Sequence, residues 1–436
     1  MLTTVIQFSI ENLELGYSIS YVLHTFLVTL TFQLCMYYAN LYDLNSSVSN
    51  NKLFIKILQA FAGTTLVLAA LFYLLPQVTV SRGIILSGLA VAFLFVVGWR
   101  LFYQYLHGMA HFRVKVLIIG TGVEAKKLTR ELLHNKSLGY EVKGFIDEDP
   151  AKLGMSIVNP KVIGTLDQLP AIVEHEGIDK VVVALPDRRG KLPLGALLAC
   201  KLRGVDVEEE TTFYEKISGK VLLENLRPSW IIFSRGFAIT PLLGGLKRLA
   251  DILLVSISLP LTALLMPVIA MLIKLDSRGS VFFTQQRVGQ NGKLFTLVKF
   301  RSMRADAEVD TGPVFAGEND SRITRVGKLL RKTHLDELPQ LLNVLRGDMS
   351  FVGPRPERPF FVDQLEKEIP YYTQRLSVKP GITGWAQVNY HYASTTEDAI
   401  EKLQLELYYI KNMSLLLDLF IILKTVKIAV LGTGAQ

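Results

Sequence analysis

The sequence predicts a chain of three parts: membrane α-helices at residues 1–112, a Rossmann-like α/β domain at 113–235, and a second α/β domain, mainly helical, at 236–436. Three observations predict this fold class. Long apolar runs fill the first quarter, strands and helices then alternate, and a further apolar run at about 246–275 has basic residues at both ends. A chain of 436 residues is also too long for one ordinary hydrophobic core.

Composition narrows the class of protein. Half of the residues are hydrophobic while 20% are charged, a mixture typical of an integral membrane protein with soluble domains. The net charge of +8 suits nucleic acid, an anionic bilayer surface or phosphate-bearing substrates. The placement of the basic residues favours the last two, so we expect no nucleic-acid partner. Cys35 and Cys200 match no metal or disulfide spacing and indicate free thiols in a reducing compartment.

Three apolar segments precede the soluble part, at roughly Tyr17–Tyr38, Leu53–Leu75 and Gly83–Leu106. Each is long enough to cross a bilayer core of about 30 Å. The first contains several polar residues, so a buried helix of the bundle is the alternative for it. No basic residue precedes the first segment and several follow the third, which favours an N-terminus outside and a cytoplasmic remainder. The first residues lack the basic region and cleavage site of a signal peptide.

An α/β pattern begins at residue 113. Buried strands are predicted at Val114–Ile119, near Glu141–Ile146 and at Lys180–Ala184, with a helix at Ala125–His134 after the first strand. This alternation predicts a doubly wound, Rossmann-like sheet. Such a domain also offers a surface for a homodimer, which the sequence neither requires nor excludes.

The first strand of that domain ends in the turn Gly120-Thr121-Gly122. The pattern Gly-x-Gly-x-x-Ala brings backbone N–H groups to the start of a helix, where a nucleotide phosphate can bind. Gly120 and Gly122 are therefore candidates for a nucleotide loop. The alternative is that the turn needs glycine only for its own geometry.

The apolar run Ile252–Ile273 has basic residues on both sides, whereas a spanning helix is expected to show an asymmetry of charge. Pro260 and Pro267 lie within it, and each removes an N–H donor and disturbs the preceding turn. The segment at about 246–275 is therefore predicted to be a re-entrant helix that enters the membrane and returns to the same face. A kinked spanning helix is the alternative.

Charged residues gather in the segments that follow. Lys299 and Arg301 are expected on one face of a strand, where two cations are costly unless an anion lies between them. A solvated basic face is the alternative. Asp336 and Glu337 precede Pro339, and because proline is tolerated only in the first turn of a helix, the two acids are predicted at a helix N-terminus.

A helix N-terminus stabilises negative charge, so the pKa of Asp336 can be lowered there. Simple capping is the alternative. Arg331 and Arg355 lie near the acids in the sequence, and anions gathered among cations are what a magnesium-assisted phosphoryl site requires. Leucines at i, i+3, i+4 and i+7 predict a buried helix face after the acids (Leu338, Leu341, Leu342, Leu345). Residues 403–432 are predicted to form one amphipathic helix in the membrane interface.

Four motifs in order, over about residues 240–436, resemble those of the bacterial sugar transferase family, the monotopic phosphoglycosyl transferases. The motifs are Lys-Phe-Arg-Ser-Met at 299–303, Leu-Asp-Glu-Leu-Pro-Gln-Leu at 335–341, Gly-Asp-Met-Ser-Phe-Val-Gly-Pro-Arg-Pro-Glu at 347–357 and Pro-Gly-Ile-Thr-Gly-Trp-Ala-Gln-Val-Asn at 380–389. With the preceding helices and the Rossmann-like domain, the chain is similar to the long polyprenyl-phosphate hexose-1-phosphate transferases of exopolysaccharide biosynthesis.

The resemblance implies a function. Such an enzyme transfers a sugar 1-phosphate from a UDP-sugar to undecaprenyl phosphate and releases UMP, on the cytoplasmic face of the bacterial inner membrane. Asp336 matches the nucleophile that carries the phosphosugar and lies beside Mg²⁺, and Glu337 matches its acidic partner. Lys299, Arg331 and Arg355 match residues that support the acids or the phosphates, and Arg301 is a further candidate for phosphate binding.

The sequence leaves two other functions as alternatives. A membrane-bound nucleotide-sugar dehydratase or epimerase would need a Tyr-x-x-x-Lys pair, and no lysine in this chain has a tyrosine four residues before it. A non-enzymatic scaffold of polysaccharide assembly would use the acidic pair as a helix cap and the basic residues as contacts to lipid.

Overall fold

The computed structural model describes residues 19–42, 50–74, 82–108, 113–135, 138–185, 192–223, 236–237, 240–304, 320, 322–390 and 395–431. Contacts within the chain define two compact units, Met1–Glu210 and Thr211–Gln436. The start of the first predicted membrane segment, before residue 19, lies outside the described residues.

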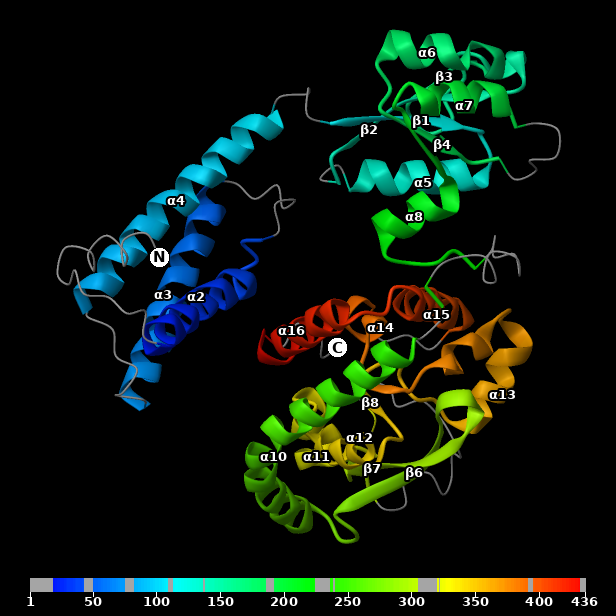
Figure 1. Ribbon diagram of the computed structural model, residues 1–436. Helices are drawn as coiled ribbons and strands as arrows, with labels where there is room; N and C mark the ends of the chain where they lie inside the picture. The colour runs from blue at the N-terminus through cyan, green and yellow to red at the C-terminus, as the bar shows by residue number, and fades with distance from the viewer. Residues whose placement is uncertain are drawn as a thin grey trace. The chain divides into compact units, whose positions relative to one another are not determined.

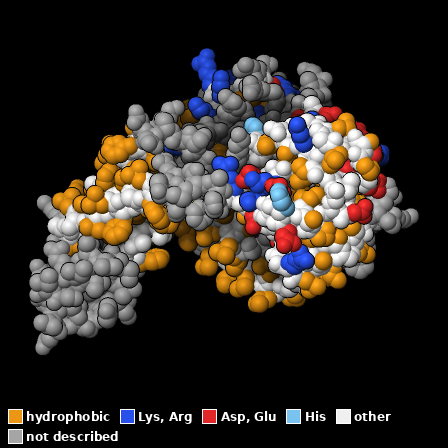
Figure 2. Space-filling view, turned by 90° about the horizontal axis from the view of Figure 1, so that it is seen from above, with side chains coloured by type: hydrophobic (Ala, Val, Ile, Leu, Met, Phe, Trp, Pro, Cys, Tyr) orange, Lys and Arg blue, Asp and Glu red, His pale blue; other side chains and the backbone are white. Residues whose placement is uncertain are grey.

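The N-terminal part is helical, as predicted, with α2 (Ile19–Tyr38), α3 (Asn50–Leu74) and α4 (Arg82–Gly108) shown in Figure 1. Within α3 and α4, the segments Leu53–Leu74 and Gly83–Tyr103 are long and apolar enough to cross a membrane. A space-filling view shows hydrophobic side chains on the outside of these helices (Figure 2). Among the described residues α10 contains the third segment of this kind.

Helix α2 packs within a small apolar cluster of the N-terminal helices. Met36 on α2 and Ile57 and Phe61 on α3 are buried in it, and Phe93 on α4 packs against it. Thr31 satisfies its hydroxyl within α2 by donating to the carbonyl of residue 27 at 2.8 Å. Such packing is expected of a spanning helix and of a buried bundle helix alike, so both predictions for the first apolar segment stay open.

The Rossmann-like part is a five-stranded, wholly parallel sheet in the order β3-β2-β1-β4-β5. Helix α5 covers one face of it, and α6 and α7 cover the other (Figure 1). The three predicted strands are confirmed, whereas the two edge strands were not predicted, because one contains a glycine and the other is mostly acidic. The elements are β1 (Val114–Ile119), α5 (Val123–His134), β2 (Tyr140–Asp147), β3 (Val162–Thr165), α6 (Leu169–Glu176), β4 (Lys180–Val183), α7 (Leu194–Leu202) and β5 (Asp206–Glu209), with 3₁₀ turns η4 (Pro150–Lys152) and η5 (Leu166–Gln168).

The segment after the sheet belongs to the C-terminal unit, earlier than the predicted boundary at 235/236. The first residue of helix α8 (Glu210–Ser218) closes the first unit and the rest of the helix belongs to the second. Glu215 accepts from Lys411 at 2.6 Å, and Val221 is buried in the core of that unit. Composition alone could not place the boundary, because the partners of Glu215 lie 196 and 197 residues away in the sequence.

The C-terminal unit is mainly helical with two small sheets. Strands β6 (Phe282–Val288) and β7 (Leu294–Phe300) form an antiparallel pair, and β8 (Ser350–Val352) pairs in parallel with β9 (Gly381–Thr383). Its α-helices are α10 (Pro241–Asp276), α11 (Arg325–Lys332), α12 (Leu341–Arg346), α13 (Pro359–Glu368), α14 (Trp385–Asn389), α15 (Thr396–Lys411) and α16 (Leu415–Leu431). The 3₁₀ turns are η6 (Gln290–Gly292), η7 (Leu335–Gln340) and η8 (Tyr372–Ser377).

Helix α10 is continuous over 36 residues, and its first arm is bound to the unit by polar contacts. Arg248 donates to the carbonyls of Val344 and Leu345 at 2.5 and 2.7 Å, so it satisfies the C-terminal end of α12. Asp251 accepts hydrogen bonds from the first two residues of β8. Exposed leucines and isoleucines cover the middle of the helix, as an apolar surrounding would require.

The second arm of α10 is bound to the same unit. Arg301, directly after β7, donates to the carbonyl of Ser277 at 2.8 Å, just beyond the end of the helix. Figure 1 shows α10 bending between the two arms, and both predicted prolines, Pro260 and Pro267, lie inside it. Both ends of the helix are therefore fixed to one small unit.

The C-terminal segment differs from the prediction of one interfacial helix at 403–432. The structure has two helices, because α15 ends at Lys411 and α16 begins at Leu415. Ser414 separates them and accepts from the amide of Leu417 at 3.2 Å, which is the contact of a helix N-cap. Helix α15 forms the core of the unit through buried residues on most of its faces (Leu403, Leu405, Leu407, Tyr409, Ile410).

Candidate active site

The acidic pair lies in the first turn of a helical segment, but the segment differs from the prediction. Asp336 and Glu337 belong to the 3₁₀ turn η7, which runs into α12, and Pro339 lies within the turn instead of starting an α-helix. His334 precedes the turn with φ = 55°, a left-handed conformation that redirects the chain after α11. Both acids are buried at 8% exposure, which a simple surface cap would not require.

The predicted leucine face is only partly correct. Leu341 is buried, and Val344 rather than a predicted leucine accompanies it in the core. Leu342 and Leu345 are 42% and 39% exposed. The reason is the 3₁₀ turn, which has about three residues per turn and so changes the phase of the pattern where α12 begins.

Two cations hold Glu337. Lys299 Nζ and Arg355 Nη2 both donate to Glu337 Oε1, at 2.7 and 2.9 Å. Burial alone would raise the pKa of Glu337, but the charges of Lys299 and Arg355 outweigh it and hold that pKa far below its ordinary value. Glu337 is therefore ionised at neutral pH, and it positions both cations beside Asp336.

The pKa of Asp336 is shifted in the opposite direction from that of Glu337. Burial, aided by the charge of Glu337, raises its pKa, although Lys299 and Arg355 act against the rise. The sequence predicted that a helix terminus could lower this pKa. The direction is reversed because desolvation dominates at a carboxyl that is almost fully enclosed.

Lys299 reaches the acids because α12 is fixed against β7. The buried side chain of Asn343 on α12 accepts from Val298 N at 3.2 Å and donates to Thr296 O at 2.8 Å. Both partners lie on β7, so the amide holds the helix to the edge of the strand pair. This contact sets the distance between Lys299 and Glu337, which are 38 residues apart in the sequence.

Arg301 has a different position from the one predicted. Its guanidinium donates to the carbonyls of Ser277 and Arg278 and to the Ser277 hydroxyl, at 2.8 to 2.9 Å. Arg301 thus binds the carbonyls beyond the C-terminal end of α10, whereas Lys299 binds Glu337.

Arg331 lies in the last turn of α11, and no described contact joins it to the acidic pair. Its Nη1 atom is buried and has no hydrogen-bond partner among the residues described. The pKa of Asp320 is lowered to about 2, mainly by its hydrogen bonds to Arg322 and to a smaller extent by the charge of Arg331. A buried nitrogen without a partner is costly, and it is a suitable donor for an anionic ligand.

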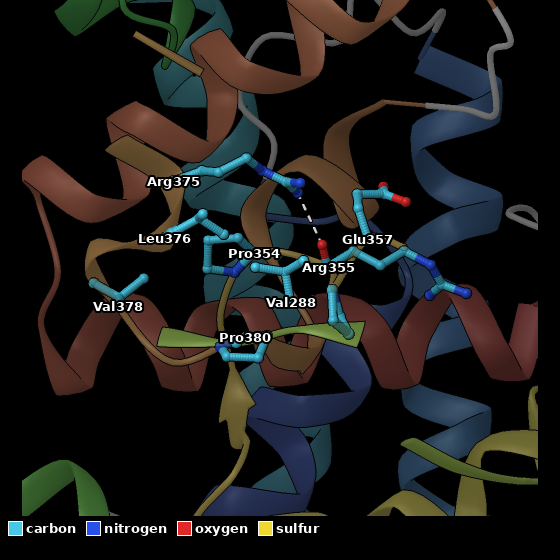
Figure 3. A pocket seen from close by; sticks show the side chains of 10 residues that line it. Val288, Pro354, Arg355, Glu357, Arg375, Leu376, Val378 and Pro380 are labelled. Carbon is cyan, nitrogen blue, oxygen red and sulfur yellow. Dashed lines mark hydrogen bonds between the residues drawn. The ribbon is translucent and has the colours of Figure 1, made fainter. Parts of the chain in front are cut away.

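The loop that presents Arg355 borders a small pocket (Figure 3). Val288 and several prolines form much of its wall, and the side chain of Arg355 extends away from Arg375 (Figure 3). Glu357 is held by Lys402 at 2.5 Å and by Arg287 at 3.7 Å. Burial opposes its ionisation, but these neighbouring cations lower the pKa of Glu357 to about 2.

Several residues of this region were not singled out from the sequence: Arg287, Glu357, Arg375, Lys402 and Glu406. Glu357 was visible only as the last residue of the Pro-Arg-Pro-Glu motif. The others come from strands and helices far apart in the chain, and no local pattern distinguishes them from ordinary surface charges.

The candidate nucleotide loop lies at the end of β1, as predicted. Gly120 has φ = 108°, and a Cβ there would lie 2.5 Å from the carbonyl oxygen of Ala184. This close approach explains the glycine by backbone geometry alone. Asp147 lies at the end of β2 and accepts from Thr121 at 2.5 Å and from Lys152 at 3.0 Å.

Among the described residues, no group of three or more His, Cys, Asp or Glu side chains is arranged to hold a metal ion. The two cysteines are free thiols. The fold and the site together define a membrane-bound protein whose C-terminal unit encloses two acids among cations, a chemistry suited to phosphate groups.

Comparison with known proteins agrees with this class. Residues 243–432 match the model of the family described as bacterial sugar transferase, and residues 38–207 match one described as a CoA-binding domain. A UDP-glucose:undecaprenyl-phosphate glucose-1-phosphate transferase of Escherichia coli (strain K12) is 35% identical over 325 residues, covering 72% of this chain and 67% of the relative.

Another relative is more similar over a shorter region. A UDP-N-acetylgalactosamine-undecaprenyl-phosphate N-acetylgalactosaminephosphotransferase of Aeromonas hydrophila is 44% identical over 240 residues, or 55% of this chain. The chain spans 56% of that relative's length and 66% of a UDP-glucose:undecaprenyl-phosphate glucose-1-phosphate transferase of Xanthomonas campestris pv. campestris, which is 35% identical. The chain belongs to the bacterial sugar transferase family, which confirms the resemblance seen in its motifs.

Proposed function

We propose that this chain transfers a sugar 1-phosphate from a UDP-sugar to undecaprenyl phosphate, giving undecaprenyl-diphosphate-sugar and UMP, as the first membrane step of exopolysaccharide synthesis. The observation that carries the proposal is the buried acidic pair with Lys299 and Arg355 joined to Glu337. The names of the Aeromonas, Xanthomonas and Escherichia coli relatives support the donor and acceptor classes.

In the proposed first step an Asp336 oxygen attacks the phosphorus that bears the sugar. A bond from that oxygen to phosphorus forms, the bond from phosphorus to the UMP oxygen breaks, and UMP leaves. Enclosure of Asp336 supports this role, because a carboxylate with few waters around it is a stronger nucleophile. Lys299 and Arg355 lie where they would balance the charge of the phosphates.

In the proposed second step a phosphate oxygen of undecaprenyl phosphate attacks the same phosphorus, and the Asp336 carboxylate leaves. Two transfers at one carboxylate allow a water-soluble donor and a lipid acceptor to use one site in turn. Glu337 keeps both cations in place during the exchange. Arg331, with a buried Nη1 that lacks a described partner, is proposed as a further phosphate ligand.

Magnesium fits this site as an ion held mainly by the substrate. Mg²⁺ commonly binds one or two carboxylates together with substrate phosphates, and it needs no cage made only of protein. Asp336 would be the protein ligand, because Glu337 already accepts two cations on one oxygen. When bound, the ion would neutralise charge on the diphosphate and assist the departure of UMP.

The site is proposed to lie at the cytoplasmic face of the bacterial inner membrane, where α10 enters the bilayer and returns. Attachment of both α10 arms to one unit supports this, since a helix that spans a bilayer of about 30 Å separates its ends by that distance. The two prolines supply a physical cause for the bend.

The proposed function is tested by incubating the purified full chain with undecaprenyl phosphate, Mg²⁺ and a panel of UDP-sugars, and measuring released UMP. Repeated UMP release is expected with at least one donor and only in the presence of the lipid acceptor, whereas at most one UMP per chain is expected without lipid. Excess chelator is expected to stop it, because the diphosphate charge is then unbalanced. Full turnover in chelator would disprove the metal role, and absence of UMP and of lipid product with every donor would disprove the function.

The re-entrant topology is tested separately by cysteine labelling in intact inner-membrane vesicles. Single cysteines replacing Ser277 and Thr240, which flank α10, are expected to react with an impermeant thiol reagent from the same side. The matched control places one cysteine at Tyr42, which follows α2, and one at Asn50, the first residue of α3, and both are expected to be labelled from one side. Labelling of the two α10 positions from opposite sides would show a spanning helix instead.

A further inference from the structure

The backbone that carries Arg355 is fixed by four consecutive carbonyls. The carbonyls of residues 354, 355, 356 and 357 accept from Gly381 N at 2.9 Å, Arg375 Nη2 at 2.8 Å, Arg287 Nη1 at 3.0 Å and Val288 N at 3.0 Å. Two of the four residues are prolines without an N–H group, and the segment belongs to no helix or strand. Its conformation therefore depends on donors supplied from elsewhere in the fold.

The donor to the carbonyl of Arg355 is a buried side chain. The side chain of Arg375 is 2% exposed and that of Glu406 is 3% exposed. Nε and Nη2 of Arg375 bind the two carboxylate oxygens of Glu406, both at 2.7 Å, and Nη1 donates to the Tyr372 hydroxyl at 3.1 Å. Each nitrogen of the guanidinium thus has a defined partner, and Figure 3 shows its remaining bond to the Arg355 carbonyl.

An ion pair at this depth needs an explanation other than stability. Removing two charges from water is costly, and well-packed hydrophobic residues at such positions are often as stable. Glu406 also lies on α15, the core helix of the unit, so it anchors Arg375 to a rigid element. The ion pair is thus a rigid support. Its arginine donates to the carbonyl of Arg355, the residue whose own side chain donates to Glu337.

We propose that Arg375, held by Glu406, is a positioning residue for the transfer reaction. Arg375 fixes the Arg355 carbonyl, and the fixed backbone directs the Arg355 guanidinium toward Glu337 and the donor phosphates. This inference rests on the proposed function. Lysine cannot replace Arg375, because a single ammonium cannot bind both Glu406 oxygens and the Arg355 carbonyl in the planar arrangement of a guanidinium.

The first test is the single substitution Arg375→Lys in the full chain. A turnover number lower by about 10- to 100-fold is expected, since a small misplacement of a binding group has effects of this size. Glu406→Gln keeps the shape and is expected to cause a smaller loss, and it serves if the lysine variant does not fold. Glu215→Gln, which changes another buried ion pair of the unit, is the matched control and is expected to lower the melting temperature without changing turnover.

A double-mutant cycle with Arg355→Lys separates positioning from general destabilisation. If Arg375 acts through Arg355, the Arg375→Lys or Glu406→Gln change should cost less than about threefold when Arg355 is already replaced. Losses that multiply, or turnover of Arg375→Lys and Glu406→Gln equal to that of the unmodified chain, would overturn the proposal. Because the unmodified chain is assayed in parallel, absence of UMP release there would count against the proposed function and not against the role of Arg375.

Discussion

Asp336→Asn is expected to lower UMP release by at least about 10⁴-fold, the scale of loss when a nucleophile is removed. Asparagine keeps the shape of the side chain but cannot form the acyl-phosphate bond of the proposed first step. The measurement is UMP release with the best UDP-sugar and undecaprenyl phosphate. A second readout is capture of labelled sugar phosphate on the protein when the lipid is left out, which is expected for the unmodified chain and not for the variant.

The matched control for this change is Asp363→Asn on α13, at an exposed position outside the site. The control is expected to turn over at the rate of the unmodified chain, because a charge exposed to water has little influence on a buried centre. Retention of transfer by Asp336→Asn would refute the nucleophile assignment. Such a result would favour a role for the acidic pair as a helix cap.

Glu337→Gln is expected to lower turnover by about 100-fold while leaving a measurable residual rate. The substitution removes the negative charge that both Lys299 and Arg355 bind, so each cation loses its partner in a buried site. Breaking a buried ion pair in this way costs about 3 kcal/mol or more of stability. Turnover and the melting temperature of the purified chain in detergent should therefore fall together.

Glu401→Gln provides the comparison for the second substitution, because it removes a glutamate paired with Lys220 on the same unit. That pair is partly exposed, so its loss is expected to change the melting temperature little and turnover not at all. Equal turnover of Glu337→Gln and the unmodified chain would show that the two cations need no acidic partner to work.

Much of the fold could be predicted because the relevant patterns are local. Apolar runs of sufficient length marked α3, α4 and α10, and short β-branched runs marked β1, β2 and β4. The edge strands β3 and β5 were not predicted, because β3 contains a glycine and three of the four residues of β5 are acidic, so neither resembles a buried strand. The break between α15 and α16 was not predicted for another reason. It is marked by a single serine cap, Ser414, and the sequence on both sides of it is rich in apolar residues.

The candidate site was likewise predicted only in part. The motifs identified Asp336, Glu337, Lys299 and Arg355, and the structure brings these four together. Arg301 had the same appearance in the sequence as Lys299, two positions away, but its guanidinium binds the carbonyls beyond the end of α10. The type of a charged residue limits its chemistry, whereas its partner depends on which element packs against it.

By itself, the sequence determined that the chain carries membrane helices, a parallel sheet and an acidic pair accompanied by cations. These features could be predicted because the spacing of apolar residues and the order of the motifs are local properties of the sequence. Only the tertiary structure decided that burial raises the pKa of Asp336 and that Glu337 receives both cations. It also decided that residues 211–223 belong to the C-terminal unit and that Arg375 and Glu406 support the Arg355 loop. Desolvation and ion pairing depend on distances in space between segments far apart in the chain, and no local pattern contains those distances.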